Sequence, residues 1–147
     1  MQTRNRVRVK ALGLIRNGDR LFVAEGYHPD LQKHYNRALG GSIEFGETSL
    51  DALQREFQEE IQAELANIQY LGCIENLFTY AGQPCHELIQ LYQCDFADPQ
   101  FYQLDQLTFM EDPRDGINEP IIARWIECDR FKTGDLWLVP EACLEFL

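Results

Sequence analysis

The chain between residues 48 and 71 contains neither glycine nor proline, and this stretch constrains the fold more than any other. Thr48, followed by Asp51 three residues later, is typical of the first turn of a helix, where a side-chain oxygen accepts a hydrogen bond from a backbone N–H that lacks a helical partner. Apolar residues then recur at spacings of three and four, which places them on one stripe facing a core. This stripe consists of Leu50, Leu53, Phe57 and Ile61. We therefore expect a helix that begins at about Thr48.

Three glutamates, Glu56, Glu59 and Glu60, share a second face of this helix. Carboxylates at these spacings repel one another by roughly a few tenths of a kcal/mol per pair. No Lys or Arg stands four residues after Glu60 to relieve that repulsion. One interpretation is a solvated helix face, which is common for such residues. The other is a site for Mg²⁺ or Mn²⁺, because hard divalent cations prefer carboxylate oxygens.

The residues before the helix extend this pattern and favour the metal site. Gly41 is followed by five residues and then Glu47, and Glu47 by seven residues and then the run Arg55-Glu56-Phe57-x-Glu59-Glu60. This spacing resembles the Nudix box, the signature of the Nudix hydrolases, and every charged position of that signature matches.

Three positions differ from the usual family pattern. Gln62 stands where the box has glycine, Ala63 where it has a larger aliphatic residue, and Leu39 where a proline usually precedes the double glycine. Since a glycine would help to end the helix, Gln62 predicts that the helix continues through Glu64 or Leu65.

The resemblance implies a fold and a set of metal ligands. The fold is a Nudix-type α/β/α sandwich with a mixed β-sheet, and the order of predicted elements agrees with this α/β class. The implied ligands are the carbonyl of Gly40, the carboxylates of Glu56, Glu59 and Glu60, and Glu119, which stands six residues before Trp125. Glu87 and Glu111 are alternatives to Glu119.

Further roles follow from the same resemblance. Either Glu56 or Glu119 would accept the proton of the attacking water, and the choice between them stays open. Arg55 and Glu47 would pair and orient the helix with its ligands. Arg37 is the candidate for binding substrate, because it lies on the short stretch that leads into the double glycine.

The rest of the chain divides into short elements without a linker or repeat, so we expect a single domain over residues 1–147. The patterns predict a strand over 5–15, a turn at 17–19, a strand over 21–24, a loop over 25–36, a hairpin of 68–79 with 88–96 around a turn at 81–84, a loop over 97–118, a strand over 121–126 and a helical segment over 140–146. From the first loop, His28, Lys33, His34 and Tyr35 could also hold a substrate, and Tyr27, Tyr35, Phe78 and Tyr80 could stack on a base.

Composition limits the partners. A formal charge of −11 disfavours long nucleic acids, whereas a small anion can bind where metal ions and a few cations reverse the local field. The chain has no apolar run long enough for a membrane span and no apolar signal core at its start, so we expect a cytoplasmic protein. Five cysteines without a C-x-x-C pair fit reduced structural thiols. A homodimer is one possible assembly.

Together, these features predict a Mg²⁺- or Mn²⁺-dependent pyrophosphohydrolase acting on a nucleoside diphosphate linked to another moiety, as the resemblance implies. The box does not discriminate among nucleoside diphosphate sugars, ADP-ribose, dinucleotide polyphosphates and nucleoside triphosphates. The alternatives are a house-cleaning triphosphate hydrolase and a nucleotide-sensing module without turnover. RNA decapping ranks lower because the chain lacks a basic surface.

Overall fold

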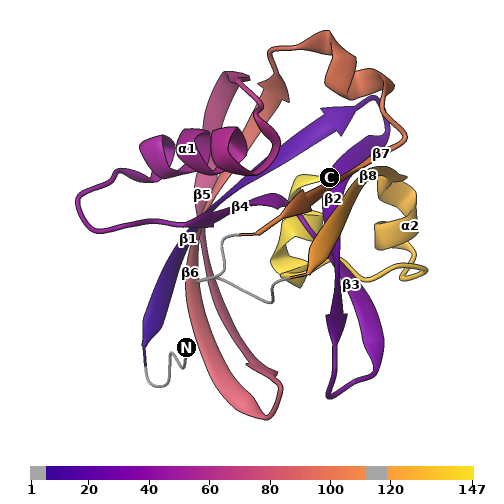
Figure 1. The fold of residues 1–147 in the computed structure, drawn as a ribbon. Coiled ribbons are helices and arrows are strands. Elements are labelled where there is room, and N and C mark those ends of the chain that lie inside the picture. Colours follow the sequence, from indigo (N-terminus) through magenta and orange to yellow (C-terminus); the bar gives the residue numbers. More distant parts are fainter. Residues whose placement is uncertain (1–5, 112–118) are drawn as a thin grey trace.

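The computed structural model describes residues 6–111 and 119–147 of the chain. Within these ranges it contains eight strands and four short or medium helices (Figure 1). The strands are β1 (Val7–Asn17), β2 (Arg20–His28), β3 (Lys33–Arg37), β4 (Leu39–Ser42), β5 (Leu65–Tyr80), β6 (Gln83–Phe96), β7 (Gln106–Met110) and β8 (Pro120–Glu127). The helices are α1 (Ser49–Ile61), α2 (Cys128–Lys132) and the 3₁₀ helices η1 (Pro99–Gln103) and η2 (Glu141–Phe146).

The strands form a mixed sheet that opens beyond the β1–β2 hairpin. Along the main path their order is β5-β6-β1-β2-β8-β7. Strands β1 and β2 pair only at the hairpin end, where Arg16 lies opposite Leu21 and Asn17 opposite Arg20. Farther along, β1 pairs with β4 and runs parallel to β6, whereas β2 pairs with β3 and β8. The two halves of the sheet therefore separate, and the chain crosses between them at Ala38.

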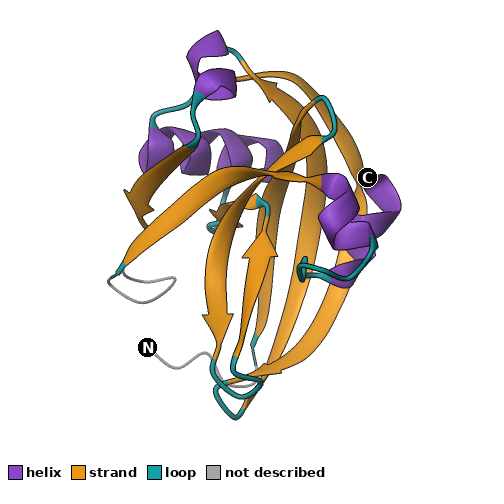
Figure 2. Ribbon diagram, turned by 90° about the vertical axis from the view of Figure 1, so that its right-hand side faces the viewer, coloured by secondary structure: helices purple, strands orange, loops and turns teal. Residues whose placement is uncertain are grey.

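Helices lie on both sides of the strands (Figure 2). Successive residues of β1 serve two apolar cores, because side chains alternate along a strand. Ala11 and Ile15 belong to the core that includes Phe57 of α1, whereas Leu12 and Leu14 belong to the core that includes Phe131 of α2 and Cys143 of η2. This arrangement confirms the predicted α/β sandwich with a mixed sheet between helices.

Helix α1 begins as predicted, with the Thr48 hydroxyl accepting a hydrogen bond from the Asp51 N–H at 3.1 Å. Leu53, Phe57 and Ile61 are buried, but Leu50 is 41% exposed and does not reach the core. Leu50 and Ala52 both lie in the first turn of α1, and it is Ala52 that is buried in the core.

The predicted continuation of α1 to Glu64 or Leu65 is wrong, because the helix ends at Ile61. Gln62 adopts the left-handed conformation, with φ of 52°, that glycine usually supplies at this position. Its backbone N–H donates to the Gln58 carbonyl at 3.1 Å and its side-chain Nε2 donates to the Glu59 carbonyl at 3.1 Å. These bonds satisfy carbonyls of the last turn, so a glutamine ends the helix without a glycine.

Two segments expected to be loops contain strands. Residues 25–36 lie mostly in a β2–β3 hairpin, which pairs Ala24 with Arg37 and His28 with Lys33. Within residues 25–36 the buried side chains are those of His28 and Asn36, both polar, so this stretch lacks the apolar alternation that marks a strand in the sequence. Residues 99–103 form η1 and 106–110 form β7, while the part of the expected loop at 112–118 lies outside the described residues.

Other elements follow the sequence predictions more closely. The turn at Gly18 joins β1 to β2, and β5 and β6 form a long hairpin with Ala81 and Gly82 at positive φ in its turn. The closing segment forms the 3₁₀ helix η2, and all five cysteines are free thiols. Among the described residues, no helix is long and apolar enough to cross a membrane.

Candidate active site

Two glycines of β4 bring the backbone close to the glutamates of α1. Gly40 has φ of 149°, and a Cβ there would overlap the carbonyl oxygen of Ala11 on β1. A Cβ on Gly41 would overlap the carboxylate of Glu56. Glycine is required at both positions because each lies against another group with no space for a side chain. The Glu56 carboxylate therefore lies directly against the β4 backbone.

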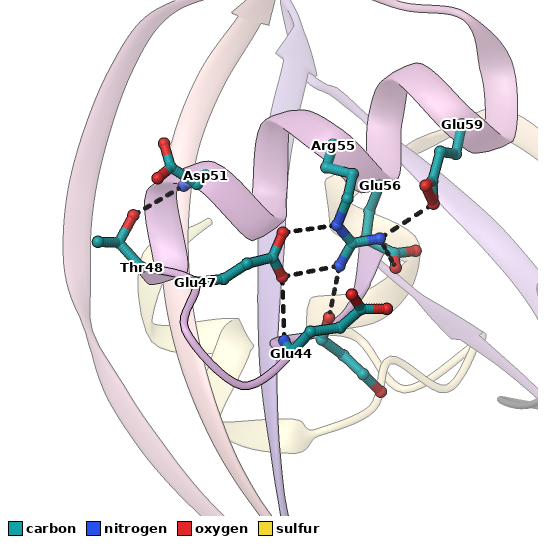
Figure 3. A network of polar contacts seen from close by, with 8 residues as sticks. Glu44, Glu47, Thr48, Asp51, Arg55, Glu56 and Glu59 are labelled. Atoms are coloured by element: carbon teal, nitrogen blue, oxygen red, sulfur yellow. Dashed lines mark hydrogen bonds and ion pairs between the residues drawn. The ribbon is translucent and has the colours of Figure 1, made fainter.

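Arg55 connects the turn before α1 to two of the helix glutamates (Figure 3). Its Nε and Nη2 donate to the two carboxylate oxygens of Glu47 at 2.6 and 3.0 Å. Its Nη1 donates to Glu56 Oε1 at 2.9 Å and to Glu59 Oε1 at 3.0 Å. Nη2 also donates to the carbonyl of Ser42 at 3.0 Å. One guanidinium thus orients three carboxylates relative to the end of β4.

The charges of this network stabilise one another. Hydrogen bonds from Arg55, and then from the backbone of Glu44, hold the pKa of Glu47 below its ordinary value. Glu47 in turn raises the pKa of the Arg55 guanidinium. Both groups therefore remain ionised near neutral pH, which preserves their two-point contact.

The three helix glutamates differ in their exposure. Glu56 is buried, with 4% exposed, Glu60 is half-buried, and the side chain of Glu59 is 53% exposed. Within residues 6–111 and 119–147, no three Asp, Glu, His or Cys side chains already converge closely enough to enclose a metal ion. The donors on this face are nonetheless all oxygens, the type that Mg²⁺ and Mn²⁺ prefer.

A cavity of about 710 Å³ lies next to this helix face. Of the eight residues to which the sequence analysis gave a catalytic, phosphate-binding or metal-binding role, five line it, namely Arg37, Gly40, Glu56, Glu60 and Glu119. Glu47, Arg55 and Glu59 are not among the residues that line it. The structure thus brings four of the five predicted metal ligands, from β4, α1 and the residue before β8, to one cavity.

Aromatic side chains from three strands line the same cavity. Tyr27, Tyr35, Phe78 and Tyr80 all contribute to its wall. Burial raises the pKa of both Tyr35 and Tyr80, so their hydroxyls stay protonated at neutral pH. Flat side chains in a cavity that also holds charged groups suit a ligand with both a ring and an anion.

The other residues considered for substrate binding have structural contacts. His28 is buried, and its Nε2 lies 2.7 Å from the Thr79 carbonyl. The ammonium of Lys33 lies 4.5 Å from the centre of the Trp137 ring. His34 also lines the cavity, and its Nδ1 is 3.2 Å from Glu25 Oε1. These contacts indicate that His28 and Lys33 join β2 and β3 to neighbouring segments.

Sequence reasoning did not predict that two cations of β1 line the cavity. Arg8 and Lys10 of β1 and Glu87 of β6 all line it. In the sequence, Arg6, Arg8 and Lys10 occupy alternate positions, which indicates one face of a strand but gives no sign of a cavity beside it. Glu87, the alternative to Glu119 as a metal ligand, forms ion pairs with Arg8 and Arg37 in the structure.

The fold and this cavity together define an α/β/α protein in which a helix carrying several glutamates follows a short strand with two glycines. The NUDIX domain family model matches residues 4–136, so the chain belongs to the NUDIX family. It is accordingly a Nudix hydrolase, an enzyme that acts on phosphoanhydride bonds. No curated protein sequence matches the chain.

Solved structures of similar fold agree with this assignment. A NUDIX hydrolase from Nitrosomonas europaea superposes with a TM-score of 0.63 at 17% identity, covering 95% of this chain and 87% of that one. A MutT protein from Bacillus halodurans has a TM-score of 0.59 at 14% identity, covering 95% and 79%. A MutT NUDIX hydrolase from Burkholderia pseudomallei has a TM-score of 0.57 at 18% identity, covering 85% and 86%. At these identities the likeness extends to the fold alone.

Proposed function

We propose that the enzyme is a divalent-metal-dependent pyrophosphohydrolase that cleaves a nucleoside diphosphate linked to another moiety, giving a mononucleotide and a phosphorylated product. One observation carries the proposal: Glu56, Glu60 and Gly40 line the same cavity as Arg37 and a set of aromatic side chains. The carboxylates suit a metal ion, the guanidinium of Arg37 suits a phosphate, and the aromatic rings suit a nucleobase.

Gly40, Glu56, Glu59, Glu60 and Glu119 would hold Mg²⁺ or Mn²⁺. Their oxygens fit a hard cation, and Arg55 contacts one oxygen, Oε1, of both Glu56 and Glu59, which holds the two carboxylates in place for the ion. When bound, the metal would neutralise phosphate oxygens and lower the pKa of a coordinated water.

This chain's own residues would then complete the reaction. A water oxygen attacks one phosphorus, the bond from that phosphorus to the bridging oxygen breaks, and the bridging oxygen leaves with the second phosphate. Glu56 or Glu119 accepts the proton of the water. Arg37 contacts the substrate phosphates, while Arg55 and Glu47 hold the helix glutamates in position.

The candidate substrates all belong to one chemical class. Nucleoside diphosphate sugars, ADP-ribose, dinucleotide polyphosphates and nucleoside triphosphates all present a base and a phosphoanhydride. The presence of every charged box residue favours turnover over a sensing module.

The free cysteines support a reducing compartment such as the cytoplasm, and the charge of −11 disfavours long nucleic acid as a partner.

A turnover assay tests this proposal. Release of mononucleotide and phosphate is measured from a panel of these compounds with Mg²⁺, with Mn²⁺ and with chelator. Glu59→Gln and Glu60→Gln are compared with Glu64→Gln, which makes the same charge change at an exposed residue beyond the helix. We expect metal-dependent turnover that falls by at least tenfold in the first two variants and stays unchanged in the third. Turnover that is equal in all three variants, or absent with every substrate, would contradict the proposal.

A further inference from the structure

Glu87 of β6 is a fully buried carboxylate contacted by two arginines from different strands. It is 1% exposed. Arg37 Nη2 donates to Oε1 at 2.8 Å, and Arg8 Nη2 donates to Oε2 at 3.2 Å. Asn76 Nδ2 donates to Oε1 at 3.4 Å. Each carboxylate oxygen therefore holds one guanidinium in place.

The parallel pairing of β1 with β6 creates this cluster. Arg8 and Glu87 are direct neighbours in that pairing although 79 positions separate them in the sequence. Arg37 arrives at the end of β3, immediately before the chain enters β4. Three strands thus deliver the cluster to one place, and all three of its residues line the cavity that contains Glu56.

The charges of the cluster do not cancel. One carboxylate faces two guanidinium groups, which leaves a surplus of one positive charge among these three residues. Burial alone would raise the pKa of Glu87, but Arg37, Lys10 and Arg8 hold it below its ordinary value, so the carboxylate is charged. Nε of Arg37 is buried and has no hydrogen-bond partner among the described residues.

Stability gives little reason for such a cluster. Moving an ion out of water costs roughly several kcal/mol. A protein in which apolar residues of similar volume replace a buried ion pair is often at least as stable. The other glutamates that line the cavity make it acidic elsewhere, so the surplus positive charge of this cluster makes one side of the cavity suited to an anion. Guanidinium groups match the geometry of phosphate oxygens well.

We propose that Arg8 and Arg37 bind a phosphate group of the substrate at the basic side of the cavity, and that Glu87 is a positioning residue that holds both guanidiniums for this contact. The ligand class is a phosphate anion. Only the identity of the whole substrate rests on the proposed function.

Binding of inorganic pyrophosphate, followed by ³¹P NMR in chelator, tests the arginines without metal or turnover. We expect Arg8→Gln to weaken binding about tenfold or more, since a hydrogen bond to a charged group is lost. Arg6→Gln removes the same charge two residues away, from an exposed residue that does not line the cavity, and should change affinity little. Equal weakening by both variants, or no binding to the parent protein, would overturn the proposal.

The variant Glu87→Gln distinguishes a role of Glu87 in positioning the two arginines from a purely electrostatic role of its charge. Removing the carboxylate adds one net positive charge to the cavity, so a purely electrostatic role predicts tighter pyrophosphate binding. Positioning predicts weaker binding, together with a higher KM and a smaller change in kcat. Tighter binding in the folded variant would overturn the proposed role of Glu87. Circular dichroism checks the fold, and where Glu87→Gln does not fold, Glu87→Asp and Arg8→Gln decide the question.

The outcome is independent of the proposed function. If no compound is hydrolysed but pyrophosphate binding depends on Arg8, the phosphate site is supported while the proposed reaction fails. If hydrolysis depends on metal but Arg8→Gln changes neither pyrophosphate binding nor KM, the phosphate site is overturned while the proposed reaction stands.

Discussion

Arg55 and Glu47 face each other at the entry to α1 in a two-point ion pair, with N–O distances of 2.6 and 3.0 Å. Glu47 precedes the helix, whereas Glu56 and Glu59, the other acids that Arg55 contacts, lie on it. Since Arg55 also donates to the Ser42 carbonyl, these contacts fix the helix face relative to the end of β4, the strand that carries Gly40 and Gly41. A planar guanidinium can make these contacts together, but a single ammonium cannot.

Arg55→Lys should therefore lower activity while keeping the charge. Lysine cannot contact Glu47, Glu56 and Glu59 at once, so the glutamates lose their common orientation. We expect kcat/KM to fall by about 10- to 100-fold, as is usual when a residue that orients metal ligands is changed. Arg130→Lys, at an exposed pair with Asp135, is the matched control. Equal activity of both variants would argue against an orienting role.

Glu47→Gln should destabilise the protein in a way that depends on pH. The folded state lowers the pKa of Glu47, chiefly through the hydrogen bonds from Arg55. The ionised Glu47 carboxylate therefore adds to the free energy of unfolding above the unfolded pKa of about 4.3. This stabilisation is lost as the pH falls through the lower folded pKa. We expect Glu47→Gln to lower the free energy of unfolding by about 1 kcal/mol or less at pH 7, since the Arg55–Glu47 pair is partly exposed.

Urea midpoints measured at pH 7, 5 and 3 give the required comparison for this variant. The difference between Glu47→Gln and the parent should shrink at the lowest pH. Glu64→Gln, at an exposed site, is the control for the loss of one acid. A difference that stays constant over the whole range would show that the charge of Glu47 contributes nothing.

Gly41→Ala should reduce activity through Glu56. The added methyl would overlap the Glu56 carboxylate, which must then leave its place beside β4. A displacement of about 1 Å at a reacting centre can cost about 100-fold in rate. The control, Gly13→Ala, adds a methyl on β1 that would lie 3.1 Å from Cys94 Sγ in the core, and Gly13 does not itself line the cavity. It should lower stability by about 1–3 kcal/mol without a comparable loss of kcat.

Gln62→Gly should stabilise the protein. A non-glycine residue in the left-handed conformation costs about 1 kcal/mol, and Gln62 recovers part of this through its bond to the Glu59 carbonyl. Gln62→Ala removes the bond but keeps the strained backbone, so it should be less stable than the parent. Urea midpoints of the two variants should therefore move in opposite directions. A decrease in both would mean that the side-chain bond outweighs the strain.

The sequence was most informative where the determinants are local. Thr48 and the spacing of the glutamates along one helix predicted the start of α1 and its acidic face, because both depend on residues within a few turns. The end of the helix was mispredicted because a glutamine side chain performs there the task of a glycine. Nothing in the residue type indicates that Gln62 will adopt a positive φ.

Determinants that lie far apart in sequence could not be predicted. Glu87 meets Arg8 only because β6 runs parallel to β1, and no local pattern encodes that pairing. The β2–β3 hairpin was missed because much of it faces a polar cavity or solvent, which removes the apolar alternation expected of a strand.

Thiol reactivity should divide the five cysteines into two groups. Burial raises the pKa of Cys94 to about 12 and that of Cys143 to about 11, and it also raises that of Cys128. Since only a thiolate attacks a disulfide reagent, these three buried thiols should react slowly at pH 8 in the folded protein. Cys73 is exposed and Cys85 is partly exposed. Titration with a chromogenic disulfide should therefore detect about one to two fast thiols in the native state and all five in denaturant, with one fewer fast thiol in Cys73→Ser. Fast reaction of all five in the folded protein would mean that the two cores open far more readily than their packing indicates.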